Sequence, residues 1–158
     1  YGVMKYDSRD RDVILNSVNT VRVTTGNGAV EYEQMIRSPI DAYKWELVDR
    51  LRILAELTGA VLVVEDSYPG WPCREDSPLQ QLCRRVYHRL TGQKLKTEKV
   101  NSCAETGVIA GAIPDMDIVA LAPWGRGAHT PREHLDLDTL QPFWKFLTAL
   151  LRAMCEEA

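Results

Sequence analysis

The sequence predicts an α/β protein in which a β-hairpin and a helix are followed by alternating helices and strands. Two runs rich in β-branched residues meet across Gly26-Asn27-Gly28, which is a strong signal for a tight hairpin turn. Two Ser-Pro pairs, at Ser38 and Ser77, each precede apolar residues at helical spacing. The near-continuous apolar stretch 116–122 is typical of a strand covered on both faces of a sheet.

The first half of the chain is predicted to run strand, strand, helix, strand. We expect hairpin strands at 13–25 and 29–36, a helix between Ser38 and Gly59, and a short apolar strand at 60–64. Ser38 is the expected N-cap of the helix, with Pro39 at its first position, and Gly59 is the expected stop. The loop 67–76 contains Tyr-Pro-Gly-Trp-Pro, which cannot continue a strand, so we place a domain boundary there.

The second half is predicted to run helix, strand, helix, strand, helix, which is the pattern of an α/β layered domain. The expected elements are a helix between Ser77 and Gly92, a strand at 94–100, a small-residue helix at 102–113, the strand at 116–122 and, after a loop at 124–137, a final amphipathic helix capped by Asp138.

Composition excludes several classes of function. The net charge is −3 with both signs mixed along the chain, so neither nucleic acid nor an anionic membrane is an expected partner. The longest apolar runs are too short to span a bilayer, and the first residues show no secretory signal. None of the four cysteines has a CxxC spacing, so buried free thiols in a cytoplasmic protein are favoured over disulfides.

A few polar residues are placed where they can do chemistry. His129 follows the 116–122 strand on a glycine-containing loop, where a histidine can ligate a metal, although an ordinary loop residue also fits. Arg37 ends a hairpin strand and can bind a carboxylate, or it is simply an exposed strand end. Glu105 begins a helix, where a carboxylate is also favoured for structural reasons, and Asp117 is expected to be structural.

Several motifs occur together in a fixed order. They are Ser17-x-Asn19, Arg37-Ser38, Tyr68-Pro69-Gly70-Trp71, Pro-Asp-Met-Asp117, Ala-Pro-Trp-Gly-Arg-Gly-Ala-His129-Thr-Pro-Arg-Glu133 and Phe143-Trp-Lys-Phe-Leu147. This combination resembles the aminoacyl-histidine dipeptidases, within the aminoacylase and carboxypeptidase group of dizinc exopeptidases. The resemblance covers essentially the whole chain.

The resemblance implies a catalytic α/β domain into which a smaller lid domain is inserted. Residues 1–66 would be the second half of the lid, part of a split β-α-β sheet that clamps substrate and dimerises. Residues 67–158 would be the last α-β-α-β-α elements of the catalytic domain. The chain would then be the C-terminal part of a longer, cytoplasmic, homo-oligomeric enzyme.

The same resemblance implies roles for individual residues. His129 matches the last metal ligand of a site holding two zinc ions, with cobalt or manganese as alternatives, and Arg37 matches the lid arginine that binds the substrate carboxylate. The other ligands and the general base belong to the N-terminal half, so we expect this chain alone to be inactive on dipeptides.

One motif departs from the family pattern. His-Ala-Gly-Leu-Glu-Cys-Gly becomes Asn101-Ser-Cys-Ala-Glu105-Thr-Gly107, which keeps Glu105 and Gly107. Cys103 replaces a glycine whose backbone lies near the substrate, so Cys103 is a predicted substrate-binding position and Glu105 an uncertain one. Shifted specificity or reduced activity is the expected consequence. The alternative is a free-standing, non-catalytic binding or dimerisation module that reuses the scaffold.

Overall fold

A computed structural model describes residues 2–101 and 104–157. The chain divides into two compact units. The first unit contains Tyr1–Cys73 and Glu98–Met116, and the second contains Arg74–Thr97 and Asp117–Ala158. The segment around α3 therefore groups with the N-terminal sheet, although it lies far from that sheet in the sequence.

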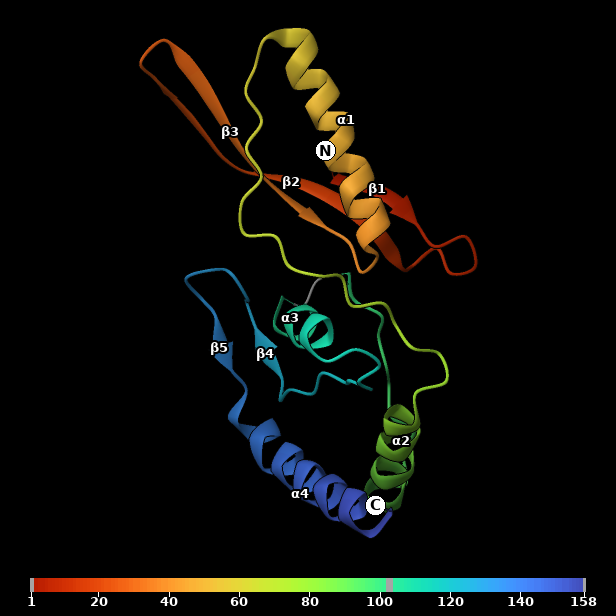
Figure 1. Ribbon diagram of the computed structural model, residues 1–158. Helices are drawn as coiled ribbons and strands as arrows, with labels where there is room; N and C mark the ends of the chain where they lie inside the picture. Colours follow the sequence, from red (N-terminus) through yellow and green to blue (C-terminus); the bar gives the residue numbers. More distant parts are fainter. Residues whose placement is uncertain (1, 102–103, 158) are drawn as a thin grey trace. The chain divides into compact units, whose positions relative to one another are not determined.

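The first unit is built on a three-stranded antiparallel sheet. Its strands are β1 (Gly2–Tyr6), β2 (Ile14–Gly26) and β3 (Ala29–Arg37), in the order β1-β2-β3 (Figure 1). The predicted hairpin is confirmed: Gly26 pairs with Ala29, and the two turn residues, Asn27 and Gly28, both have positive φ. Such a turn matches the right-handed twist of the strands. The short strand β1 was not predicted.

Helix α1 (Asp41–Thr58) packs on one face of this sheet, with Val18, Leu47 and Val48 buried between them. Asn16 lies on the same face and donates a hydrogen bond from Nδ2 to the Tyr43 carbonyl oxygen at 2.8 Å. Because strand side chains alternate, the intervening Ser17 lies on the opposite face.

The predicted cap of α1 is wrong by two residues. The helix begins at Asp41, and Ile40 at the N-cap position supplies no side-chain bond. The Ser38 hydroxyl instead accepts from the Ile40 N–H at 3.1 Å and donates to the Leu15 carbonyl oxygen at 2.7 Å, so it ties the β3–α1 link to β2. The predicted stop at Gly59 is confirmed, since this residue has the left-handed conformation with φ 70°.

The Tyr-Pro-Gly-Trp loop is held against the start of α1. The Gly70 N–H donates to Asp41 Oδ1 at 2.8 Å, and Lys44 bridges Asp41, also at 2.8 Å, and the Tyr68 carbonyl oxygen. Partial burial acts to raise the pKa of Asp41, but the bonds from Lys44 and Gly70, together with the Lys44 charge, hold that pKa below its ordinary value of 3.8. The motif therefore has a structural role in this unit.

Helix α3 (Ala104–Ala112) lies against the same loop. A Cβ added at Gly107 would come within 2.3 Å of the Pro69 carbonyl oxygen, and one added at Gly111 within 2.5 Å of the Pro69 ring. The two glycines therefore let the helix approach Pro69 closely. The helix predicted at 102–113 is confirmed over most of its length, but Val108 and Ile109 are exposed.

The second unit is built on α2 (Pro78–Thr91) and α4 (Leu140–Glu157), which pack around a common apolar core. The core residues are Leu82, Cys83, Val86, Phe146, Leu150 and Ala153. Tyr87 packs edge-on against Phe146 with ring centroids 5.5 Å apart, and Arg85 makes two 2.9 Å bonds to the Glu157 carboxylate. Among the described thiols Cys83 is buried, as predicted, and burial raises its pKa, whereas Cys73 and Cys155 are exposed.

The predicted start and end of α2 are confirmed. The Ser77 side chain accepts from the Gln80 N–H at 2.9 Å, and Gly92 ends the helix at φ 70°. Asp117 adds a second cap, since its Oδ2 accepts from the Leu79 N–H at 2.8 Å. The structural role predicted for Asp117 is thus observed.

Three predicted strands are wrong. Residues 60–64, 94–100 and 116–122 form no β-ladder with any described residue. Val61 is 89% exposed, so this apolar run is uncovered by the described part of the chain. An apolar run becomes a strand only when a neighbour accepts and donates its backbone hydrogen bonds, and no such neighbour lies within the described ranges.

The predicted loop 124–137 contains more structure than expected. It holds the two-residue strands β4 (Gly125–Arg126) and β5 (His134–Leu135), followed by a 3-10 turn at Leu137–Thr139. The cap of that turn is Asp136, which accepts from the Asp138 N–H, so the prediction of Asp138 as the cap is wrong. None of the described helices is long and apolar enough to cross a membrane.

Candidate functional site

His129 lies at the tip of the small β4–β5 hairpin, in the second unit. The tip is fixed by its own hydrogen bonds: the Thr130 hydroxyl donates to the Gly127 carbonyl oxygen at 2.7 Å, and the Glu133 N–H donates to the Thr130 carbonyl oxygen at 3.0 Å. Gly127 has φ 65°, and a Cβ there would come within 3.0 Å of the Arg132 carbonyl oxygen. The loop therefore has a defined conformation rather than an open one.

The His129 side chain is available for a ligand. Its backbone has φ 64°, and its N–H donates to Glu133 Oε2 at 3.2 Å. The rings of His88 and His134 contact the carbonyl oxygens of Gln93, at 3.3 Å, and Arg132, at 2.6 Å, whereas the His129 ring has no hydrogen bond or ion pair with any described residue. Of the three histidines, His129 is the one whose imidazole is left for another partner.

The donors around His129 do not form a complete metal site within the described residues. Within residues 2–101 and 104–157 no group of three or more His, Cys, Asp or Glu side chains could hold a metal ion. A catalytic zinc takes three protein ligands, so His129 could serve zinc only as one imidazole donor of a larger set.

Arg37 lies at the end of β3, in the first unit, directly opposite Ser17 on β2. Its Nε donates to the weak acceptor Met35 Sδ at 3.2 Å, and it makes no ion pair with a described carboxylate. The side chain is half-buried. An unpaired, half-buried guanidinium is well suited to bind an anion.

Asn101, which begins the motif that differs from the family pattern, contacts the residue paired with Arg37. Asn101 Nδ2 donates to the Ser17 hydroxyl at 3.2 Å, across 84 positions of sequence. Glu105 is exposed in the first turn of α3. Cys103 lies outside the described residues, so its predicted substrate contact stays a prediction. Ser17 appeared in a motif without a role, and only the structure shows that it touches Asn101.

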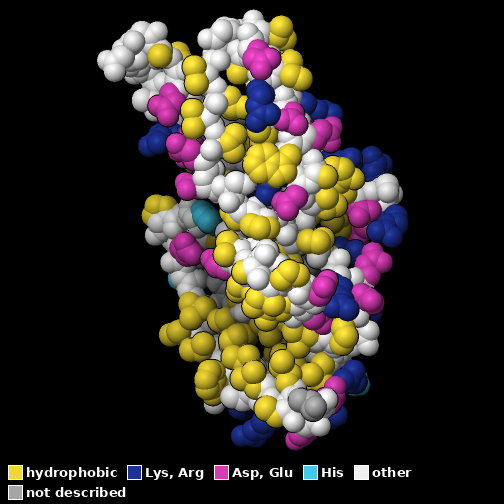
Figure 2. Space-filling model, in the orientation of Figure 1, with side chains coloured by type: hydrophobic (Ala, Val, Ile, Leu, Met, Phe, Trp, Pro, Cys, Tyr) yellow, Lys and Arg dark blue, Asp and Glu magenta, His cyan; other side chains and the backbone are white. Residues whose placement is uncertain are grey.

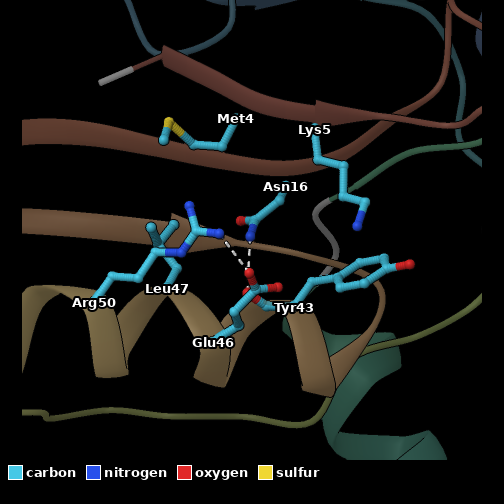
Figure 3. A pocket seen from close by; sticks show the side chains of 7 residues that line it. All are labelled: Met4, Lys5, Asn16, Tyr43, Glu46, Leu47 and Arg50. Atoms are coloured by element: carbon cyan, nitrogen blue, oxygen red, sulfur yellow. Dashed lines mark hydrogen bonds and ion pairs between the residues drawn. The ribbon is translucent and has the colours of Figure 1, made fainter.

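A separate cavity of about 250 Å³ lies between β1 and α1 (Figure 3). It is lined by Met4, Lys5, Asn16, Tyr43, Glu46, Leu47 and Arg50, and thus by none of the predicted site residues. Glu46 pairs with Arg50 at 2.6 Å, and Lys5 lies 3.8 Å from the Tyr43 ring centroid. Asn16 Oδ1 is buried without a partner among the described residues.

Comparison with known proteins shows that the chain is similar to dipeptidases in both sequence and fold. It is 32% identical over 151 residues to the cytosol non-specific dipeptidase of Escherichia coli (strain K12), covering 96% of this chain and 31% of that protein. It superposes with a TM-score of 0.76 and 32% identity on the crystal structure of aminoacylhistidine dipeptidase from Vibrio alginolyticus, with the same coverage. No protein-family model matches the chain.

These comparisons confirm the predicted resemblance to the aminoacyl-histidine dipeptidases and the predicted α/β class. The chain spans 31% of the length of both relatives, so most of each relative has no counterpart in it.

Proposed function

We propose that this chain is the C-terminal part of a zinc-dependent dipeptidase that hydrolyses aminoacyl-histidine and other dipeptides. The observation that carries the proposal is 32% identity to a cytosol dipeptidase over 96% of the chain. The name of that relative also supports a cytoplasmic location. The division into a lid portion, 1–66, and a catalytic portion, 67–158, belongs to the same proposal.

Two residues of this chain have defined roles in the proposed enzyme. His129 supplies one imidazole to the metal centre, and its lack of a ring partner among the described residues supports this role. Arg37 binds the C-terminal carboxylate of the dipeptide through its unpaired guanidinium. Bound zinc would activate water and polarise the scissile carbonyl, while the remaining ligands and the general base come from the rest of the enzyme.

The uncovered apolar surface supports a larger protein. On α4, Leu140, Trp144, Leu151 and Met154 recur at helical spacing and are exposed, beside the face that packs on α2. Figure 2 shows hydrophobic side chains gathered over the part of the chain that holds α4. Together with the unpaired stretch 116–122, this surface would be covered by the remaining two thirds of the enzyme.

Turnover by the isolated chain tests the proposal. With added zinc, cobalt or manganese, the chain should not hydrolyse β-alanyl-histidine or glycyl-histidine above a His129→Ala control, because it carries one ligand of the set. Hydrolysis above that control would overturn it. A native gene product about three times as long as this chain, measured as intact mass, would support it.

The second candidate is a dimerisation module, and the β2–β3 hairpin supports it. Beyond α1 one face of the hairpin is apolar and exposed, carrying Val23, Thr25, Val30 and Tyr32. The opposite face is polar and carries the 2.8 Å Arg22–Glu33 ion pair. A two-stranded ribbon with one apolar face is marginal alone, so a second copy of the chain is the expected cover.

Light scattering tests whether the chain associates through this face. Wild type should associate with increasing concentration, and Tyr32→Lys on the apolar face should weaken association, while Glu31→Lys on the polar face should not. A strictly monomeric wild type at high concentration would contradict the dimerisation module.

A further inference from the structure

Ser17 occupies a central position on the sheet face opposite α1. It pairs with Val3 on β1 and with Arg37 on β3, and it is 6% exposed. Directly opposed residues on antiparallel strands have Cβ atoms about 4.5–5.5 Å apart, so the Ser17 hydroxyl and the Arg37 side chain leave the sheet side by side. A neutral donor and a fixed cation thus share one face.

The hydrogen-bond pattern leaves the Ser17 hydrogen unassigned. Its oxygen accepts from Asn101 Nδ2 at 3.2 Å, and no described group accepts the hydroxyl hydrogen. A hydroxyl that accepts one bond has its rotation restricted and can donate in another direction. Asn101 therefore orients the hydroxyl, and the donor remains free for an acceptor beside Arg37.

We infer that Ser17 and Arg37 together form the seat for the substrate carboxylate, and that Asn101 is a positioning residue for Ser17. This inference rests on the proposed function, and it adds a second donor to the arginine. The guanidinium binds one or both carboxylate oxygens, and the Ser17 hydroxyl donates to the oxygen nearer β2. Charge-assisted hydrogen bonds of this kind are stronger than neutral ones.

The same contact explains how carboxylate binding can be retained with asparagine at position 101. Asn101 stands where the family pattern has histidine, and its amide reaches Ser17. An amide and an imidazole N–H can both donate to a hydroxyl oxygen. The seat selects a free carboxylate and discriminates against a neutral C-terminus, whatever side chains the dipeptide carries.

The test is an NMR titration of the full 158-residue chain with glycyl-histidine and with glycyl-histidine amide, which lacks the carboxylate. The measured quantity is the ratio of the two dissociation constants. Ser17→Ala should lower this preference for the acid about tenfold, and Asn101→Ala should lower it about threefold, because one charge-assisted bond is lost or misdirected. Ser17→Thr, which restores a hydroxyl, and Thr24→Ala, an exposed hydroxyl further along β2, should keep it.

The outcomes separate this inference from the proposed function. If Ser17→Ala and Asn101→Ala keep the full preference while Arg37→Ala loses it, the Ser17 seat is wrong and the arginine role stands. If wild type and Arg37→Ala each bind glycyl-histidine and its amide with equal dissociation constants, the Ser17 inference and the proposed role of Arg37 are both wrong. Should Ser17→Ala fail to fold, as judged by its amide spectrum, Asn101→Ala decides, because its partly exposed amide can be removed with little change in packing.

Discussion

Gly107 of α3 lies so close to Pro69 that a Cβ would come within 2.3 Å of the Pro69 carbonyl oxygen. Both partners in this contact are backbone atoms, so neither can move away as the end of a flexible side chain could. The contact therefore fixes α3 against the loop that also holds Gly70 and Asp41.

Gly107→Ala should destabilise the protein by about 1–3 kcal/mol, because the new methyl group overpacks a backbone contact. Gly26→Ala is the matched control, since a Cβ there meets nothing within 4 Å, and it should change stability by less than about 0.5 kcal/mol. Denaturant unfolding measures both variants. Equal stability of the two would show that α3 does not pack as described.

Asp41→Ala should lower stability by about 1 kcal/mol at pH 7, because it removes the acceptor for Gly70 N–H and the partner of Lys44. The folded-state pKa of Asp41 lies below 3.8, so its contribution is complete above 3.8 and is lost as the pH falls through the lowered pKa. Unfolding curves of wild type and variant should therefore converge in acid. Asp49→Ala, which breaks the exposed ion pair with Arg52, should have a smaller effect at pH 7.

His129→Ala in the full-length enzyme should lower zinc content and abolish turnover, because a catalytic zinc loses one of its protein ligands. His134→Ala is the control, since the His134 ring already contacts the Arg132 carbonyl oxygen at 2.6 Å. Metal analysis by mass spectrometry and a dipeptide assay measure the two effects. Full zinc and full activity in His129→Ala would rule out the ligand assignment.

Arg37→Ala in the full-length enzyme should leave zinc content unchanged and reduce kcat/KM sharply. A guanidinium is always cationic and cannot ligate zinc, and losing a charge-assisted carboxylate contact costs roughly 2–5 kcal/mol when bound substrate buries the pair. Arg22→Ala, which breaks the exposed pair with Glu33 on the same hairpin, should retain wild-type kinetics. Wild-type kcat/KM in Arg37→Ala would exclude a role in substrate binding.

Local signals in the sequence predicted the local parts of the fold. The Gly26-Asn27-Gly28 turn and the helix between Ser77 and Gly92 depend on a few adjacent residues, and both are observed. Strands at 60–64 and 116–122 were predicted from apolar runs alone, but a strand also needs a hydrogen-bonded neighbour, which such a pattern does not reveal.

The candidate site was predictable in part. The motif around His129 singled out the histidine whose ring lacks a partner among the described residues. The bond from Asn101 to Ser17 joins residues 84 positions apart, and no spacing rule could have predicted it. Ser38 shows the same limit on a smaller scale: its hydroxyl donates to the Leu15 carbonyl oxygen, and this contact cannot be read from the residues next to Ser38.

The left-handed backbone at His129 separates the requirement on backbone conformation from the requirement on the side chain. With φ 64°, the tip tolerates Asn, Asp or Gly in place of histidine but is strained by β-branched residues such as Val or Ile. Replacement by Asn should therefore abolish the proposed metal binding while preserving the hairpin, whereas replacement by Val should disturb both. An intact loop conformation at this position therefore does not by itself report metal binding.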